Sequence, residues 1–168
     1  ILHCAQQVFA EKGFRAAEVQ DIATSAGVSK ATIYKHFRSK DEILVTVVEE
    51  NFAHIRQIML ANMIGPEQPL DRLRKVLYET AVYLDGNKAF CHVLVRDAGE
   101  FMGVIKRLYL DLVRETTPTA EAFFEHLRQR GEIPDIPTTQ LLKLLTNAGI
   151  GVLYAWVLTD NGKLTDEV

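Results

Sequence analysis

Residues 19–40, which read VQDIATSAGVSKATIYKHFRSK, constrain the fold more than any other stretch of this chain. Two short helical patterns flank a tight turn at Gly27, and Ser29 is a favourable N-cap for the second helix. Ile33 and Phe37 lie four residues apart and share one helix face. The opposite face carries Lys30, Ala31, Tyr34 and Lys35. This pattern predicts a helix-turn-helix whose second helix enters the major groove of DNA.

The charge distribution supports this prediction. The chain of 168 residues has a net charge of −3, so it is not a general polycation. Residues 1–45 contain six basic and five acidic side chains, whereas the remainder contains 13 basic and 17 acidic ones. Between Ser29 and Lys40 there are four basic residues and no acidic one. A local basic patch on an acidic protein is what contact with DNA requires.

Helical periodicity extends over almost the whole sequence, and no alternating strand pattern persists. We expect helices at about 1–12, 18–26, 30–37, 39–63, 70–84, 88–102, 104–130 (possible bend at Pro118) and 138–158, with a turn at 160–162. The expected fold is therefore all-α. A three-helix DNA-binding domain, residues 1–45, would precede a helical ligand-binding and dimerisation domain, residues 46–168. Phe9, Ile22, Val28, Ile33, Phe37 and Leu44 are the expected core of the first domain.

The second helix of the motif offers specific groups to DNA. Ala31 is small enough for a close backbone approach, and the lysines reach phosphates or guanine acceptors. Tyr34 offers a hydroxyl to a phosphate and a ring edge to a thymine methyl group. Ser39 and Glu42 form a capping box for the next helix, whose free N–H groups could bind one more phosphate. The predicted DNA-binding residues are Ser29, Lys30, Ala31, Thr32, Tyr34, Lys35, His36 and Lys40.

These segments resemble the DNA-binding domain of the tetracycline-repressor (TetR) family of bacterial regulators. The resemblance rests on residues 9–14 (FAEKGF), 21–23 (DIA), 26–37 (AGVSKATIYKHF) and 39–44 (SKDEIL), and covers about the first 50 residues. It implies a cytoplasmic, homodimeric transcriptional repressor that binds a palindromic DNA operator and is released by a small-molecule inducer. It also implies that the side chain of Lys40 contacts a phosphate.

One position departs from the family pattern. Regulators of this kind commonly have Thr or Ser where this chain has Ala17-Glu18, and that hydroxyl caps the first helix of the motif and touches a phosphate. A glutamate favours the helix dipole but faces DNA unfavourably. We therefore expect no firm DNA contact from the start of this helix.

The last long apolar segment, residues 138–158, is the expected dimer element. Leu141, Leu144, Ile150 and Leu153 are among the residues that make it apolar nearly all round, and Gly149 and Gly151 permit close helix approach. The alternative is a buried core helix of the monomer. No apolar run reaches the ~18 residues of a membrane span, so no membrane association is expected.

An inducer site is harder to place. Aromatic residues on the later helices are candidates for a cavity lining, although most aromatics of this kind are simply core. Arg96 and Glu100 would orient a ligand in an apolar pocket or form a surface ion pair with each other. The candidate ligand-binding residues are Tyr83, Phe90, His92, Arg96, Glu100, Tyr109, Phe123 and Trp156.

Other function classes have less support. The sequence contains no Ser/His/Asp set, phosphate-binding loop or metal-ligand spacing, so we expect no enzyme, no cofactor and no metal site. His92, His126 and Glu100 match no known ligand pattern. An activator and a repressor without a small-molecule signal remain variants of the same prediction. A helical ligand-binding or interaction protein without specific DNA binding is the alternative from another class.

Overall fold

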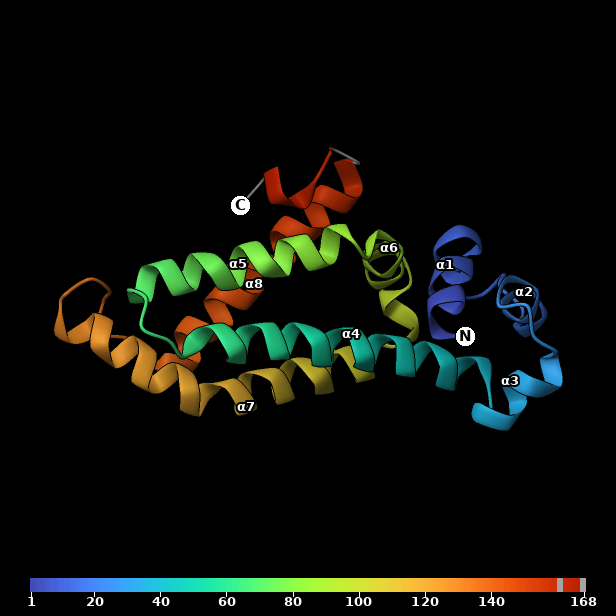
Figure 1. Cartoon of the computed structure of the whole chain (residues 1–168), viewed down its shortest axis with the longest axis horizontal. Coiled ribbons are helices and arrows are strands. Elements are labelled where there is room, and N and C mark those ends of the chain that lie inside the picture. Colours follow the sequence, from blue (N-terminus) through green and yellow to red (C-terminus); the bar gives the residue numbers. More distant parts are fainter. Residues whose placement is uncertain (160–161, 167–168) are drawn as a thin grey trace. The chain divides into compact units, whose positions relative to one another are not determined.

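The computed structural model describes residues 1–159 and 162–166, and within these ranges all regular structure is helical (Figure 1). The elements are α1 (Leu2–Lys12), α2 (Val19–Ser25), α3 (Lys30–His36), α4 (Lys40–Met63), α5 (Pro69–Asp85), α6 (Lys88–Arg96), η1 (Ala98–Glu100), α7 (Met102–Gln129), α8 (Thr138–Thr159) and η2 (Leu164–Asp166). The all-α prediction is confirmed. Asp160 and Asn161, two residues of the expected turn, lie outside the described residues.

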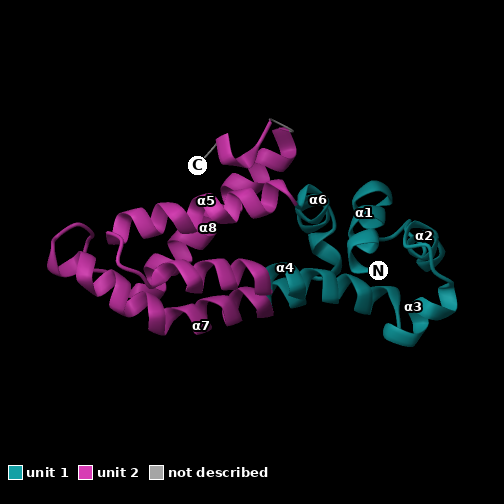
Figure 2. Cartoon of the chain, viewed as in Figure 1, with its two compact units in different colours: residues 1–52, 87–106 teal, residues 53–86, 107–168 magenta. Residues whose placement is uncertain are grey.

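The chain forms two compact units that are each discontinuous in sequence (Figure 2). Unit 1 contains residues 1–52 and 87–106, and unit 2 contains residues 53–86 and 107–168. Helix α4 contributes its first half to unit 1 and its second half to unit 2. This division differs from the single boundary expected at residue 45, because α6 packs beside α1 (Figure 1).

Unit 1 has the core that the sequence predicts, with an addition from α6. Phe9, Ile22, Ile33 and Leu44 are buried, whereas Val28 and Phe37 are only partly buried. The added residues of α6 are Phe90, Cys91 and Val93, all fully buried. Burial of large apolar side chains is the main stabilising contribution to such a small unit.

Glycines with positive φ follow the first two helices, and the one at Gly27 lies in the turn that the sequence predicts. Gly13 follows α1 with φ of 82°, and its N–H donates to the carbonyl of Phe9. Gly27 follows the end of α2 with φ of 65°, and the next N–H, that of Val28, donates to Ala23. A side chain is strained at positive φ, so glycine suits both turns.

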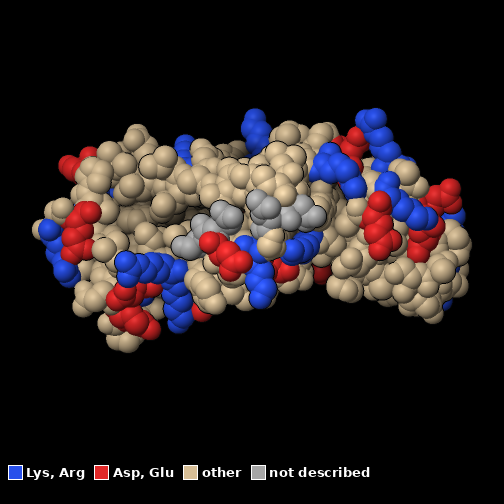
Figure 3. Space-filling model, turned by 90° about the horizontal axis from the view of Figure 1, so that it is seen from above, with Lys and Arg blue, Asp and Glu red and all other residues tan. Residues whose placement is uncertain are grey.

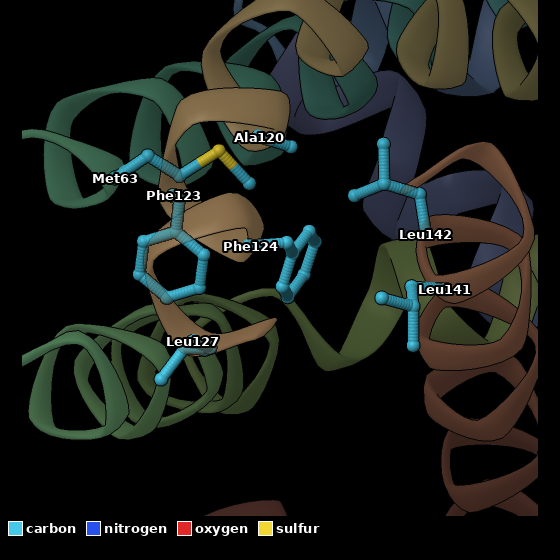
Figure 4. Close-up of a cluster of buried hydrophobic side chains, with 7 residues drawn as sticks. All are labelled: Met63, Ala120, Phe123, Phe124, Leu127, Leu141 and Leu142. Carbon is cyan, nitrogen blue, oxygen red and sulfur yellow. The ribbon is translucent and has the colours of Figure 1, made fainter. Parts of the chain in front are cut away.

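Unit 2 is built around a cluster of aromatic and aliphatic side chains from α4, α7 and α8 (Figure 4). Its buried members are Met63, Ala120, Phe123, Phe124, Leu127, Leu141 and Leu142. The rings of Phe123 and Phe124 meet edge to face, with centroids 5.0 Å apart. The guanidinium of Arg72 lies 5.1 Å from the Phe123 centroid and donates to the carbonyl of Met63, the last residue of α4.

Helix α6 is shorter than expected and is followed by a turn of 3₁₀ helix. It ends at Arg96, and the N–H of Asp97 makes the final helical bond to Val93. The carboxylate of Asp97 then accepts the N–H of Phe14. Periodicity contains no information about this tertiary bond, and it therefore predicted a longer helix. Helix α7, by contrast, is one continuous element that includes Pro118.

Helix α8 is long and apolar enough, by length and composition, to cross a membrane. In the described part of the chain, α8 is the one helix with such a length and composition. Of its most apolar 18-residue window, 22% is buried. One such helix is weak evidence for a membrane span, because core and interface helices of globular proteins have the same composition. Lys143 and Asn147 interrupt its apolar surface.

Candidate DNA-binding interface

The start of α3 is held by a side-chain cap. The hydroxyl of Ser29 accepts the N–H of Thr32 at 3.1 Å, as an N-cap residue does. The same hydroxyl lies 2.9 Å from the hydroxyl of Thr32. Ser29 and Thr32, both predicted DNA-binding residues, are therefore also part of the local structure that starts the helix.

The two faces of α3 differ as the sequence predicts. Ile33 is fully buried on the inner face, whereas Tyr34 is 48% exposed. The other members of the predicted outer row, Lys30, Ala31 and Lys35, are also exposed, and so is His36 at the end of the helix. Within the described residues, no hydrogen bond or ion pair occupies the ammonium groups of Lys30 and Lys35. Both cations are therefore available for phosphate oxygens or base edges.

Lys40, the eighth predicted DNA-binding residue, has intramolecular partners. Its Nζ donates to the carbonyls of Phe14, Arg15 and Ala17, at 2.7, 3.2 and 2.8 Å. These carbonyls lie in the loop between α1 and α2. The sequence did not indicate this, because a lysine side chain spans several positions and its direction depends on the tertiary structure.

The capping box at the start of α4 is present with one difference. The N–H of Glu42 donates to the Ser39 hydroxyl at 3.1 Å, as expected. The carboxylate of Glu42 accepts the N–H of Arg38, which precedes the N-cap, at 2.5 Å. Both interactions fix the turn that connects α3 to α4.

The start of α2 is acidic and internally paired. Glu18 is the N-cap residue, and its N–H donates to the carboxylate of Asp21 at 3.0 Å. Lys12 at the end of α1 forms an ion pair with Asp21 at 2.6 Å. The hydrogen bond from Lys12, together with that from the Glu18 N–H, lowers the pKa of Asp21 below its ordinary value of 3.8. Glu18 itself is exposed.

The candidate ligand-binding residues are divided between the two units. Phe90, His92, Arg96 and Glu100 belong to unit 1, whereas Tyr83, Tyr109, Phe123 and Trp156 belong to unit 2. Phe90, Phe123 and Trp156 are buried, and Phe123 lies in the core cluster (Figure 4). Tyr83 stacks on His54 with centroids 4.2 Å apart, and the Tyr109 hydroxyl donates to Asn147.

Arg96 and Glu100 do not pair with each other. Arg96 donates to the carbonyls of Phe9 and Ala10 and lies 3.2 Å from the Asp97 carboxylate. Glu100 pairs with Arg15 at 2.7 Å. The surface ion pair, one of the two alternatives that the sequence left open, is therefore absent, and both side chains link to the end of α1 or to the loop after it. The sequence contains no signal for the contribution of Asp97 to these links.

An open pocket of about 390 Å³ lies in unit 1 beside these links. Its lining consists of charged and small residues: Lys12, Gly13, Arg15, Ala16, Arg96, Asp97, Gly99 and Glu100. Its three cations are occupied by carboxylates or carbonyls. On the face that Figure 3 shows, Lys and Arg side chains likewise lie among Asp and Glu. In the ranges 1–159 and 162–166, no three His, Cys, Asp or Glu side chains gather as a metal site would require.

Residues 1–47 match the family model described as bacterial regulatory proteins of the TetR family. The first 47 residues of the chain are therefore similar to the DNA-binding segment of this family. The chain is 37% identical over 83 residues to the transcriptional repressor KstR2 of Rhodococcus jostii. That match covers 47% of this chain and 40% of KstR2, so it spans less than half of that relative.

A longer alignment exists with a second HTH-type transcriptional regulator. The chain is 27% identical over 145 residues to IcaR of Staphylococcus aureus, the negative regulator of the biofilm operon icaADBC. This alignment covers 86% of the chain and 78% of IcaR. The curated relatives are thus transcriptional regulators.

Solved structures show that the likeness in fold extends beyond the matched segment. The fatty acid degradation regulator FadR of Bacillus halodurans superposes with a TM-score of 0.84 at 20% identity, covering 98% of this chain and 86% of that one. FadR of Bacillus subtilis, solved in complex with stearoyl-CoA, gives a TM-score of 0.81 at 20% identity and covers 98% and 90%. At these identities the comparison shows the fold alone.

Proposed function

We propose that this chain is a DNA-binding transcriptional repressor of the TetR family, not an enzyme, which acts in the cytoplasm. The observation that carries the proposal is the two-faced α3: Ile33 is fully buried, while Tyr34, Lys30 and Lys35 are exposed and have no intramolecular polar partner in the described residues. An exposed row of this kind beside a buried anchor suits readout of the major groove. The match to KstR2 and IcaR, both repressors, supports repression rather than activation.

Binding as a homodimer to a palindromic operator is the second part of the proposal. One recognition helix contacts few base pairs, and two related by a two-fold axis read half-sites one DNA turn, about 34–36 Å, apart. Helix α8 supports this part because much of its apolar surface faces solvent. Its exposed apolar residues are Leu144, Ile150, Val152, Tyr154 and Leu158.

Release by a small-molecule inducer is the third part. The apolar helices of unit 2 are the proposed location, with Tyr83, Tyr109, Phe123 and Trp156 as candidate lining. The stearoyl-CoA held by the Bacillus subtilis FadR supports testing acyl-CoA thioesters first. Arg96 and Glu100 are better explained as links to α1 and to the loop that follows it, because their polar groups already have partners there.

Selection of fragments from a random DNA pool by the full chain tests the proposal. We expect enrichment of a palindrome, and binding to it that weakens steeply as salt rises. Acyl-CoA added to the complex should release the DNA. Equal binding to all fragments at every salt concentration would instead favour a helical ligand-binding protein without a specific operator.

A further inference from the structure

The ammonium of Lys40 uses its full hydrogen-bonding capacity within the protein. A lysine Nζ carries three donors and no acceptor. Its three acceptors are the carbonyls of Phe14, Arg15 and Ala17, all within 3.2 Å. No donor is left for a phosphate oxygen unless one of these bonds breaks.

A second contact holds the same group from another side. Nζ lies 4.6 Å from the centroid of the Phe14 ring, in the geometry of a cation–π interaction. Phe14 is buried and meets Phe9 edge to face, with centroids 5.5 Å apart. Lys40 is therefore joined to the core of unit 1 as well as to the loop.

The loop itself depends on this lysine. Residues 13–18 connect α1 to α2, and within them the N–H of Ala17 donates to Gly13. The three carbonyls named above have Lys40 as their donor, and two of these bonds are partly buried. A backbone carbonyl removed from water requires such a partner. Removing the ammonium would thus release the segment that leads into α2.

We propose that Lys40 is a positioning residue that ties the start of α2 to the start of α4, and that it is not a phosphate ligand. This proposal rests on the proposed DNA-binding function. Because α2 and α4 flank α3 in the chain, the tie constrains both ends of the segment that carries the recognition helix. Lys40 therefore acts on DNA through Tyr34 and the other exposed residues of α3.

Salt dependence separates the two roles. Each phosphate neutralised by a lysine contributes about 0.9 to the slope of log affinity against log salt. A positioning lysine contributes to affinity at every salt concentration and leaves the slope unchanged. Lys35 is a matched control, because its ammonium is exposed and has no polar partner in the described part of the chain.

The test compares full-length Lys40→Met and Lys35→Met on a duplex carrying the palindrome that the wild type selects. Affinities are measured over a salt series at a temperature where circular dichroism shows all proteins folded. Lys40→Met should bind at least about tenfold more weakly with the wild-type slope, whereas Lys35→Met should lose about 0.9 from the slope. A slope reduced by about 0.9 in Lys40→Met would overturn the proposal, and so would wild-type affinity in a folded Lys40→Met.

A second variant covers the case in which Lys40→Met does not fold. Lys40→Gln keeps two N–H donors and loses the charge. We expect an affinity below that of the wild type, because one donor is lost, again with the wild-type slope. A shallower slope in Lys40→Gln would contradict the positioning role.

Hydrogen exchange on the free protein tests the tie without DNA. In Lys40→Met, the amides of residues 14–19 should exchange at least about fivefold faster than in the wild type, while those of α5 should be unchanged. Equal exchange in residues 14–19 would overturn the proposal. If the wild type selects no DNA sequence but the exchange difference is present, the DNA-binding function fails while the tie itself stands.

Discussion

The ammonium of Lys12 lies 2.6 Å from the carboxylate of Asp21, so the last residue of α1 is joined to the first turn of α2. The same carboxylate accepts the N–H of Glu18. The pair thus fixes the entry into the helix-turn-helix with groups other than those that Lys40 holds.

Asp21→Asn should make the thermal stability of the protein depend less on pH in the acidic range. Because hydrogen bonds from Lys12 and from the Glu18 N–H lower the pKa of Asp21, the ionised form stabilises the folded state above the ordinary pKa of 3.8. That contribution is lost as the pH falls through the lowered folded-state value. Thermal midpoints should therefore be higher for the wild type near pH 7, and should converge with those of the variant below pH 3.8. Glu11→Gln, at an exposed carboxylate on α1, is the control, and a constant difference at every pH would contradict the prediction.

Tyr34→Ala should weaken operator binding without changing the fold. The side chain is half exposed, so little core packing is lost, while a base or phosphate contact is worth about 1–3 kcal/mol. We expect an affinity at least about tenfold lower in a mobility-shift titration, with the thermal midpoint unchanged. Tyr78→Ala, at an exposed tyrosine of α5, removes the same group elsewhere and should bind as the wild type does. Equal affinity of the two variants would mean that α3 meets DNA with another face.

Glu18→Thr should strengthen binding to DNA of any sequence. The substitution removes an exposed carboxylate that would repel the DNA phosphates, and it supplies a hydroxyl N-cap for α2. At low salt we expect an increase of about two- to tenfold, which shrinks at high salt because exposed charges are screened. Glu18→Gln separates the two effects, since it removes only the charge. Unchanged affinity in both variants would place the start of α2 away from the phosphates.

Arg96→Met should destabilise unit 1. Its guanidinium caps the end of α1 through the carbonyls of Phe9 and Ala10 and is 44% exposed, so solvent screening limits the loss to about 1 kcal/mol. Urea unfolding measures this change. Arg74→Met removes an arginine from an exposed ion pair on α5, and should cost less than about 0.5 kcal/mol. Equal costs would show that the links from α6 to α1 contribute little.

Ile150→Glu should dissociate the proposed dimer. The residue lies on the exposed apolar surface of α8, and a carboxylate buried in an interface without a partner costs several kcal/mol. Sedimentation velocity should then show a monomer where the wild type forms a dimer. Gln140→Glu adds the same charge to the same helix at an exposed polar position and should leave the dimer intact. A dimeric Ile150→Glu would locate the interface elsewhere.

The helix-turn-helix was predictable because its signals are local. Ser29 caps the helix that immediately follows it, and Ile33 lies one helical turn before Phe37, so spacing alone indicated which face of the helix points inward. The burial of Phe9 and Ile22 follows from the same periodicity. These features depend on residues close together in the chain.

The remaining features were not predictable because they depend on distant residues. Lys40 reaches carbonyls 23 to 26 positions away, and Arg96 reaches carbonyls 86 and 87 positions away. Periodicity shows that a side chain is polar and on which face it lies, but not which loop lies beside it. For this reason Arg96 and Glu100 suggested a ligand site from the sequence, whereas the structure gives them partners in and beside α1.

The membership of α6 in unit 1 has a consequence for protein engineering. Phe90, Cys91 and Val93 are buried in this unit, beside α1. A hybrid regulator made by a single junction after α4 would pair the α1 of one parent with the α6 of another, and their packing surfaces would not match. An exchange of unit 2 between such proteins therefore needs three junctions: within α4, before residue 87 and after residue 106. With these junctions, α6 and α1 come from the same parent.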